Sequence, residues 1–193
     1  EPPAAASGQG YGLAIYACSE GFVGQTSGLR CRHALDIDST YGMDFGLVTD
    51  SQATSTPLDI AHNGFAGHNT FVGFKGGMDV GAYAVYASEQ GFGVGANRAD
   101  KVKHPLRKVH VELIEVVMFG LDPNAYGIPG VYLSMHVDGV TLGKVDVRID
   151  SATALTSGGH SAAVRLDGAL FPGGLHVGTI ITDKIARPFV RII

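Results

Sequence analysis

Two stretches of the chain, Ala34-Leu-Asp-Ile-Asp38 and Pro57-Leu-Asp-Ile-Ala61, spell the same apolar–acid–apolar phrase 23 residues apart. In a strand, successive side chains point to opposite faces, so each Leu shares a face with its Ile while the acid points the other way. A phrase that returns at this period is typical of stacked repeats. The sequence therefore predicts that Leu58 lies over Leu35 and Ile60 over Ile37.

The same spacing continues along the chain. Strand-like segments recur mostly about 22 to 27 residues apart, at 12–17, 34–38, 57–61, 82–86, 109–114, 131–135, 163–167 and 188–193. A second series follows the first by about ten residues, at 43–49, 69–75, 91–97, 116–121, 144–150 and 175–181. In the second series Phe45 is expected to lie inside, over Phe71 or Val72. The longer step before 163–167 predicts a loop insertion near 151–162.

These segments predict an all-β fold. They are rich in Val and Ile, they alternate apolar and polar residues, and none shows a helical stripe. A repeat of about 25 residues with two or three strands suits a right-handed parallel β-helix, in which the 28 glycines serve tight corners. A β-sandwich or jelly roll is the alternative. We expect residues 1–10 to be a flexible lead-in and residues 11–193 to form one domain.

The bulk composition limits the partners. The net charge is −4 and basic residues are dispersed, so no electrostatic footprint for nucleic acid is present. No apolar run is long enough to span a bilayer, and we expect no membrane insertion. The two cysteines, Cys18 and Cys31, are too few for a disulfide scaffold or a cysteine-based zinc site.

The predicted stacking makes neighbours of the acids. Asp36 and Asp59 would point outward one turn apart, with backbones about 5 Å from each other, and Asp38 would share their face. Two stacked carboxylates repel unless they share a proton, bind a cation or have a basic neighbour. Glycosidases use carboxylate pairs at such distances, so all three are candidate catalytic residues. The alternative is that they are merely solvated acids at a strand edge.

Other polar groups gather near these acids in the sequence. Arg32, His33, His62 and His68 flank the two phrases, and an exposed Tyr such as Tyr41 suits stacking on a sugar ring. We take these as candidate substrate-binding residues. The histidines lack the spacing of a zinc site, and no metal site is expected, although the three aspartates leave calcium possible as a cofactor.

The segment CRHALDID…TPLDIAHNG…NTFVGF…GFGVGANRA resembles the β-helical region of bacteriophage tailspike and tail-appendage proteins, within the pectate-lyase-like superfamily. The matching positions are Arg32 and His33, then Asp59 and His62, then Asn97 after a Gly-Phe strand. The resemblance covers about the first half of the chain. It implies a homotrimer on the virion tail, or otherwise extracellular, that binds bacterial surface polysaccharide and in many members cleaves it.

Three functions follow as hypotheses. The first is a tailspike-like protein that binds polysaccharide and hydrolyses it with Asp36 and Asp59, assisted by Asp38. The second is a structural or receptor-binding tail module without turnover. The third is a cellular polysaccharide lyase or epimerase, for which we would expect a calcium requirement.

Overall fold

The computed structural model describes residues 10–53, 56–60, 66–78, 85–87, 105–118, 130–149, 162–183 and 190–192. Among them the secondary structure is strand, with no helix, so the all-β prediction is confirmed. No helix in the described ranges is therefore long and apolar enough to cross a membrane. The expected lead-in at 1–10 and insertion near 151–162 lie almost wholly outside the described residues.

The strands form three sheets, named sheets A, B and C here, and every pairing among them is parallel. Sheet A runs β1 (Tyr11–Tyr16), β4 (His33–Asp38), β7 (Leu58–Ile60), β10 (Val85–Ala87), β13 (Val131–Leu133), β16 (Val164–Leu166) and β18 (Val190–Ile192). Sheet B is short, with β5 (Thr40–Tyr41), β8 (Ala66–Gly67), β11 (Leu106–Arg107) and β14 (Val137–Asp138).

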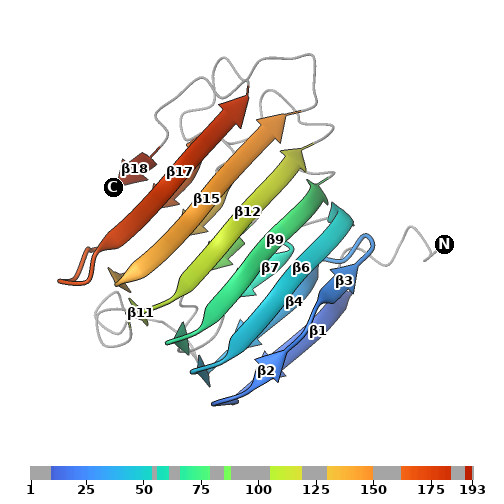
Figure 1. The fold of residues 1–193 in the computed structure, drawn as a ribbon, viewed down its shortest axis with the longest axis horizontal. Coiled ribbons are helices and arrows are strands. Elements are labelled where there is room, and N and C mark those ends of the chain that lie inside the picture. Colours follow the sequence, from blue (N-terminus) through green and yellow to red (C-terminus); the bar gives the residue numbers. More distant parts are fainter. Residues whose placement is uncertain are drawn as a thin grey trace, which may run out of the picture.

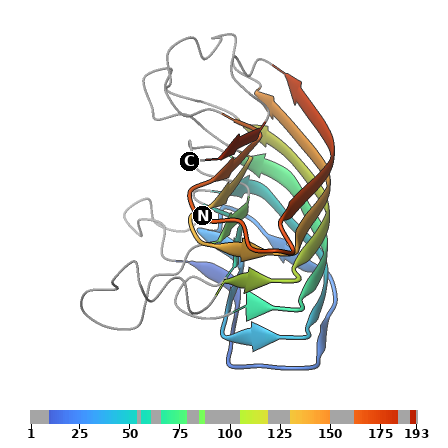
Figure 2. The same cartoon turned by 90° about the vertical axis from the view of Figure 1, so that its left-hand side faces the viewer.

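Sheet C carries the long strands, which lie side by side in Figure 1. Its order is β2 (Phe22–Val23), β6 (Asp44–Ala53), β9 (Thr70–Met78), β12 (His110–Met118), β15 (Val140–Ile149) and β17 (Leu175–Asp183), and β3 (Thr26–Gly28) also pairs with β6. From β4 to β15 the described strands pass from sheet A to B to C and then return to sheet A one strand further along, whereas β1 and β16 are followed directly by sheet C strands. Figure 2 shows the resulting stack, with sheet C as one curved side. This arrangement is compatible with a parallel β-helix and excludes an antiparallel sandwich for the described strands.

The core is a set of ladders between the sheets. Leu35 is the register partner of Leu58 and Ile37 of Ile60, as predicted, and all four are buried. In sheet C, Phe45 stacks on Phe71 with ring centroids 4.7 Å apart, whereas Val72 is 52% exposed. Like side chains above one another leave few voids and remove apolar surface from water on every turn.

One polar side chain, Asn69, lies inside this core. Its Oδ1 accepts a hydrogen bond from the backbone N–H of Met43, and its Nδ2 donates to Thr40 Oγ1 at 2.8 Å. Both halves of the amide are thus bonded to the preceding turn, so its complete burial carries little desolvation cost.

A left-handed residue forms the corner between sheets B and C on each turn. It stands one or two residues before the sheet C strand, and the six residues are Glu20, Gly42, His68, Lys108, Gly139 and Gly174. Their φ angles are all between 48° and 79°. Half of these positions therefore carry a residue with a Cβ in a conformation that favours glycine.

One segment was predicted in the wrong series of strands. Residues 109–114 were expected over 82–86 in the first series, but β12 (His110–Met118) pairs with β9 and β15 in sheet C and includes the start of the predicted strand at 116–121. In sheet A, Val85 is the register partner of Val131, a step of 46 residues instead of 22 to 27. The predicted strand at 91–97 lies outside the described residues.

Candidate functional site

The outward positions of sheet A form a single file across its strands. Buried residues on either side set the alternation for four of these positions: Leu35 and Ile37, Leu58 and Ile60, Val131 and Leu133, and Val164 and Leu166. In register order the positions are Asp36, Asp59, Tyr86, Tyr132, Arg165 and Arg191, and the side chains that the structure describes are those of Asp36, Asp59, Tyr132 and Arg165. We call this file the sheet A ladder. It passes from carboxylates through phenols to guanidinium groups.

The predicted juxtaposition of Asp36 and Asp59 is present, because the two are register partners on adjacent strands. Both are buried, at 3% and 1% exposure, and so is Asp38 at 3%. The expectation that these acids are surface groups is wrong for all three. Backbones about 4.8 Å apart permit a carboxylate separation near that of retaining glycosidases, about 5 to 5.5 Å.

Tyr16 connects the first turn to these acids. Its hydroxyl donates a 2.9 Å hydrogen bond to Asp36 Oδ2. That bond and the nearby charge of Asp36, together with burial, raise the pKa of Tyr16 to about 12. Tyr16 therefore stays a neutral donor throughout the physiological range, although its side chain remains half exposed. Ser39 Oγ donates to Asp38 Oδ1 at 3.3 Å.

His33 lies beside Asp59. Its Nδ1 is 2.6 Å from the carbonyl oxygen of Thr56, and its Nε2 is 3.7 Å from Asp59 Oδ2. The carbonyl can only accept, so Nδ1 carries the proton. Arg32 precedes it, and its backbone N–H donates to the carbonyl of Gly10. The structure thus brings His33, Asp36 and Asp59 together, with Arg32 next in the chain.

The remaining predicted residues are elsewhere. Tyr41 and His68 belong to sheet B and the corner after it, where their rings lie 4.7 Å apart. They contact each other over sheet B, away from the sheet A ladder. His62 and Asn97 lie outside the described residues.

Farther along the ladder, Tyr132, Arg165 and Asp167 form a cluster that the sequence reasoning missed. The Tyr132 hydroxyl donates to Asp167 Oδ2 at 2.8 Å, and the Arg165 guanidinium lies 4.8 Å from the centre of the Tyr132 ring. Arg165 also donates to both oxygens of Asp167. A planar guanidinium stacked on a phenol forms a flat surface with hydrogen-bonding edges. Alternation in Ala-Val-Arg-Leu-Asp (163–167) indicates which residues face outward, but not that Tyr132 is adjacent.

No group of three His, Cys, Asp or Glu side chains in the described ranges is arranged to hold a metal ion. Calcium binding by the three aspartates remains an untested prediction.

Comparison with known proteins adds no relative. No known protein family matches the chain, and neither the curated proteins nor the solved structures include a significant match.

Proposed function

We propose that the chain is part of a right-handed parallel β-helix that binds bacterial cell-surface polysaccharide along sheet A, as the tail-appendage proteins it resembles do. The sheet A ladder is the observation that carries this proposal. Three exclusively parallel sheets among the described strands support the solenoid, and four successive turns, beginning at β4, β7, β10 and β13, enter them in the same order. Right-handed crossovers between parallel strands outnumber left-handed ones by roughly fifty to one.

A file of carboxylate, phenol and guanidinium groups one strand apart suits an extended polymer. The Tyr132 ring packs on the apolar face of a sugar ring, while Arg165 bonds the hydroxyl groups at its edge. Asp36 and Asp59 are buried, so they contact the polymer only where it displaces what covers them. Because the ladder crosses all the turns, one sugar chain can contact several of them. Each contact is weak, and the polymer gains affinity from their number.

Binding is tested by affinity electrophoresis of the protein in gels that contain candidate bacterial polysaccharides. We expect Tyr132→Ala to reduce retardation and to raise the apparent Kd at least about tenfold, because losing one stacked aromatic ring costs binding free energy of this order. Phe22→Ala is the matched control, because Phe22 is an exposed aromatic residue of sheet C. Equal losses in both variants, or no retardation of the wild type by any polysaccharide, would contradict the proposal.

Hydrolysis by Asp36 and Asp59 is a second candidate function, favoured by their register pairing and by Tyr16 and His33 beside them. Because both acids are buried, turnover requires the substrate to displace whatever screens them from solvent. Release of new reducing ends by the wild type, abolished in Asp36→Asn and Asp59→Asn, would support it. Release that is the same in all three proteins would exclude these acids.

The resemblance also leads us to propose a homotrimer located on the virion tail. Light scattering after size-exclusion chromatography tests the assembly, and a mass of three chains is the expected result. A monomer at micromolar concentration would count against the trimer while leaving polysaccharide binding to its own assay.

A further inference from the structure

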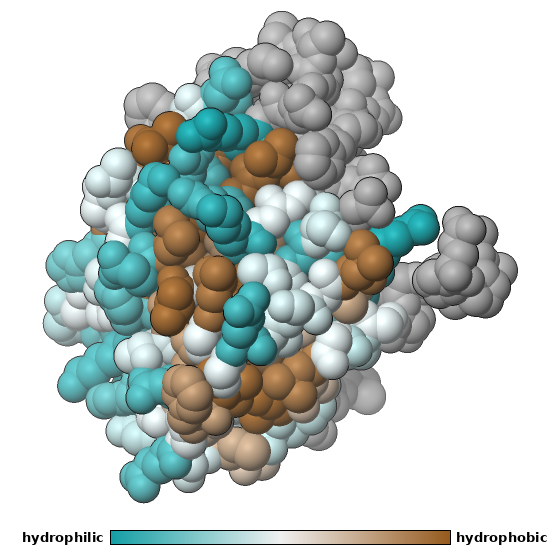
Figure 3. Space-filling view, turned by 45° about the vertical axis from the view of Figure 1, so that its right-hand side comes forward, coloured by the Kyte–Doolittle hydropathy of each residue, from teal (hydrophilic) through white to brown (hydrophobic). Residues whose placement is uncertain are grey.

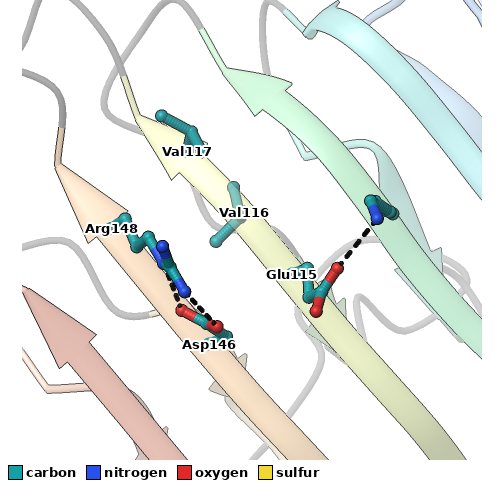
Figure 4. A pocket seen from close by; sticks show the side chains of 6 residues that line it. Glu115, Val116, Val117, Asp146 and Arg148 are labelled. Carbon is teal, nitrogen blue, oxygen red and sulfur yellow. Dashed lines mark hydrogen bonds and ion pairs between the residues drawn. The ribbon is translucent and has the colours of Figure 1, made fainter.

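The outer face of sheet C holds a pocket of about 250 Å³. It lies over three adjacent strands, with Lys75 from β9, Glu115 and Val117 from β12, and Asp146 and Arg148 from β15 among its lining residues. Figure 4 shows Glu115, Asp146 and Arg148 on neighbouring strands, with Arg148 folded back toward Asp146. This volume is slightly below the range of pockets for drug-sized ligands, so the pocket suits a group as small as one sugar unit.

The charged groups of the pocket form one connected network. Glu115 accepts from Lys144 at 2.8 Å and lies 3.2 Å from Lys75, while Asp146 lies 3.3 Å from Lys144. Arg148 donates to both oxygens of Asp146, at 2.9 and 3.0 Å. Three cationic side chains, those of Lys75, Lys144 and Arg148, thus form ion pairs with two carboxylates. Asp183, the register partner of Arg148 on β17, does not line the pocket.

The cations retain donors for a ligand. In the described part of the chain, the bonds to Asp146 use two of the five N–H donors of Arg148, and Lys75 contacts a single carboxylate. Both side chains are well exposed, at 58% and 63%. Glu115 and Asp146 instead share the cations between them, and neighbouring Lys and Arg groups lower the pKa of both.

We propose that this pocket binds a carboxylate-bearing sugar unit. The carboxylate accepts hydrogen bonds from Arg148 or Lys75. These residues lie two strands and two residues of register apart, so about 12 Å separates their backbones. Sugar hydroxyls donate to Glu115, and the apolar ring face packs against Val117. This site is on a different sheet from the sheet A ladder and does not depend on polysaccharide binding there.

The chemistry of the rim favours an acid over a neutral or cationic sugar. A neutral sugar brings no negative charge to Lys75 or Arg148, so its hydrogen bonds to them lack the ion-pair component, and an amino sugar is repelled by them. An ammonium group would also have to displace Lys144 from Glu115. An anion needs no displacement, because the exposed donors already face solvent.

Calorimetric titration with sodium glucuronate tests the proposal, with glucose and glucosamine as comparison ligands. We expect glucuronate to bind more tightly than either. We expect at least one of Lys75→Gln and Arg148→Gln, the one that removes the donor to the carboxylate, to weaken glucuronate binding at least about fivefold. Thermal unfolding of each variant verifies that it is folded.

Arg107→Gln is the matched control. Arg107 is also about half exposed and lies 3.7 Å from a carboxylate, that of Asp138, but it belongs to sheet B. We expect its loss to leave glucuronate affinity unchanged. Absence of glucuronate binding by the wild type, preference for glucosamine, or an equal effect of Arg107→Gln would each overturn the proposal.

Discussion

Asp36 and Asp59 are register partners on adjacent parallel strands, and both carboxylates are buried. Like charges at this position repel, and burial strengthens the repulsion. An amide in place of one acid removes one charge and supplies a donor to the other. We therefore expect Asp59→Asn to retain or raise thermal stability, measured by the midpoint of unfolding at neutral pH.

Asp50 is the matched control for this substitution. It is as deeply buried as Asp59, but its two oxygens accept the backbone N–H groups of Arg30 and Cys31 at 3.1 Å. An amide nitrogen cannot accept either bond, so Asp50→Asn should lower the free energy of unfolding by about 1 to 3 kcal/mol. Equal destabilisation by Asp50→Asn and Asp59→Asn would refute repulsion between the paired acids.

The Tyr16 hydroxyl is expected to lose its proton at a higher pH than an ordinary tyrosine. Its folded pKa of about 12 lies above its ordinary value near 10. The bond to Asp36 thus contributes stability that is complete below pH 10 and is lost as the pH rises through 12. Near-ultraviolet absorbance of tyrosinate follows the titration. Asp36→Ala should move one tyrosine to lower pKa, whereas an unchanged titration curve would disprove the hydrogen bond.

The network on sheet C should make stability sensitive to acid. The folded pKa values of Glu115 and Asp146 are lowered by their Lys and Arg neighbours, Lys144 first for Glu115 and Arg148 first for Asp146. This contribution is present above the unfolded pKa values, near 4.5 and 3.8, and is lost as the pH falls through the lower folded ones. Asp146→Asn should reduce the loss of stability at low pH and lower the free energy of unfolding at pH 7 by about 1 to 2 kcal/mol. Denaturant unfolding at several pH values measures both effects.

At the left-handed corners, we expect replacement of a side chain by glycine to stabilise the fold and replacement of glycine by alanine to destabilise it. Lys108 has a φ of 48° and an exposed side chain, so Lys108→Gly should stabilise the fold by up to about 1 kcal/mol. Gly139 has the equivalent corner position with a φ of 79°, and Gly139→Ala should destabilise by a similar amount. Chemical denaturation resolves such differences. A stabilising Gly139→Ala would show that the corner does not require this conformation.

The short repeated phrase was enough to predict the stacking of Leu35 with Leu58 and Ile37 with Ile60. These residues are close in sequence, on consecutive turns of nearly equal length, and alternation alone fixes their faces. Residues 109–114 could not be placed in the same way. The step between Val85 and Val131 is about twice the repeat, so a spacing rule assigns the intervening strand to the wrong sheet.

The sequence by itself determined the main strands of sheets A and C on turns of regular length, with their inward and outward faces and their neighbours, because alternation and period are local properties. It did not indicate the short strands of sheet B. Only the tertiary structure decided that Asp36 and Asp59 are buried and that Lys75, Glu115 and Asp146 are neighbours. Alternating charges in Lys144-Val-Asp-Val-Arg148 indicate one polar strand face, but not which strands flank it. Lateral pairing depends on the length of the connections, and the exposure of a side chain depends on everything packed over it.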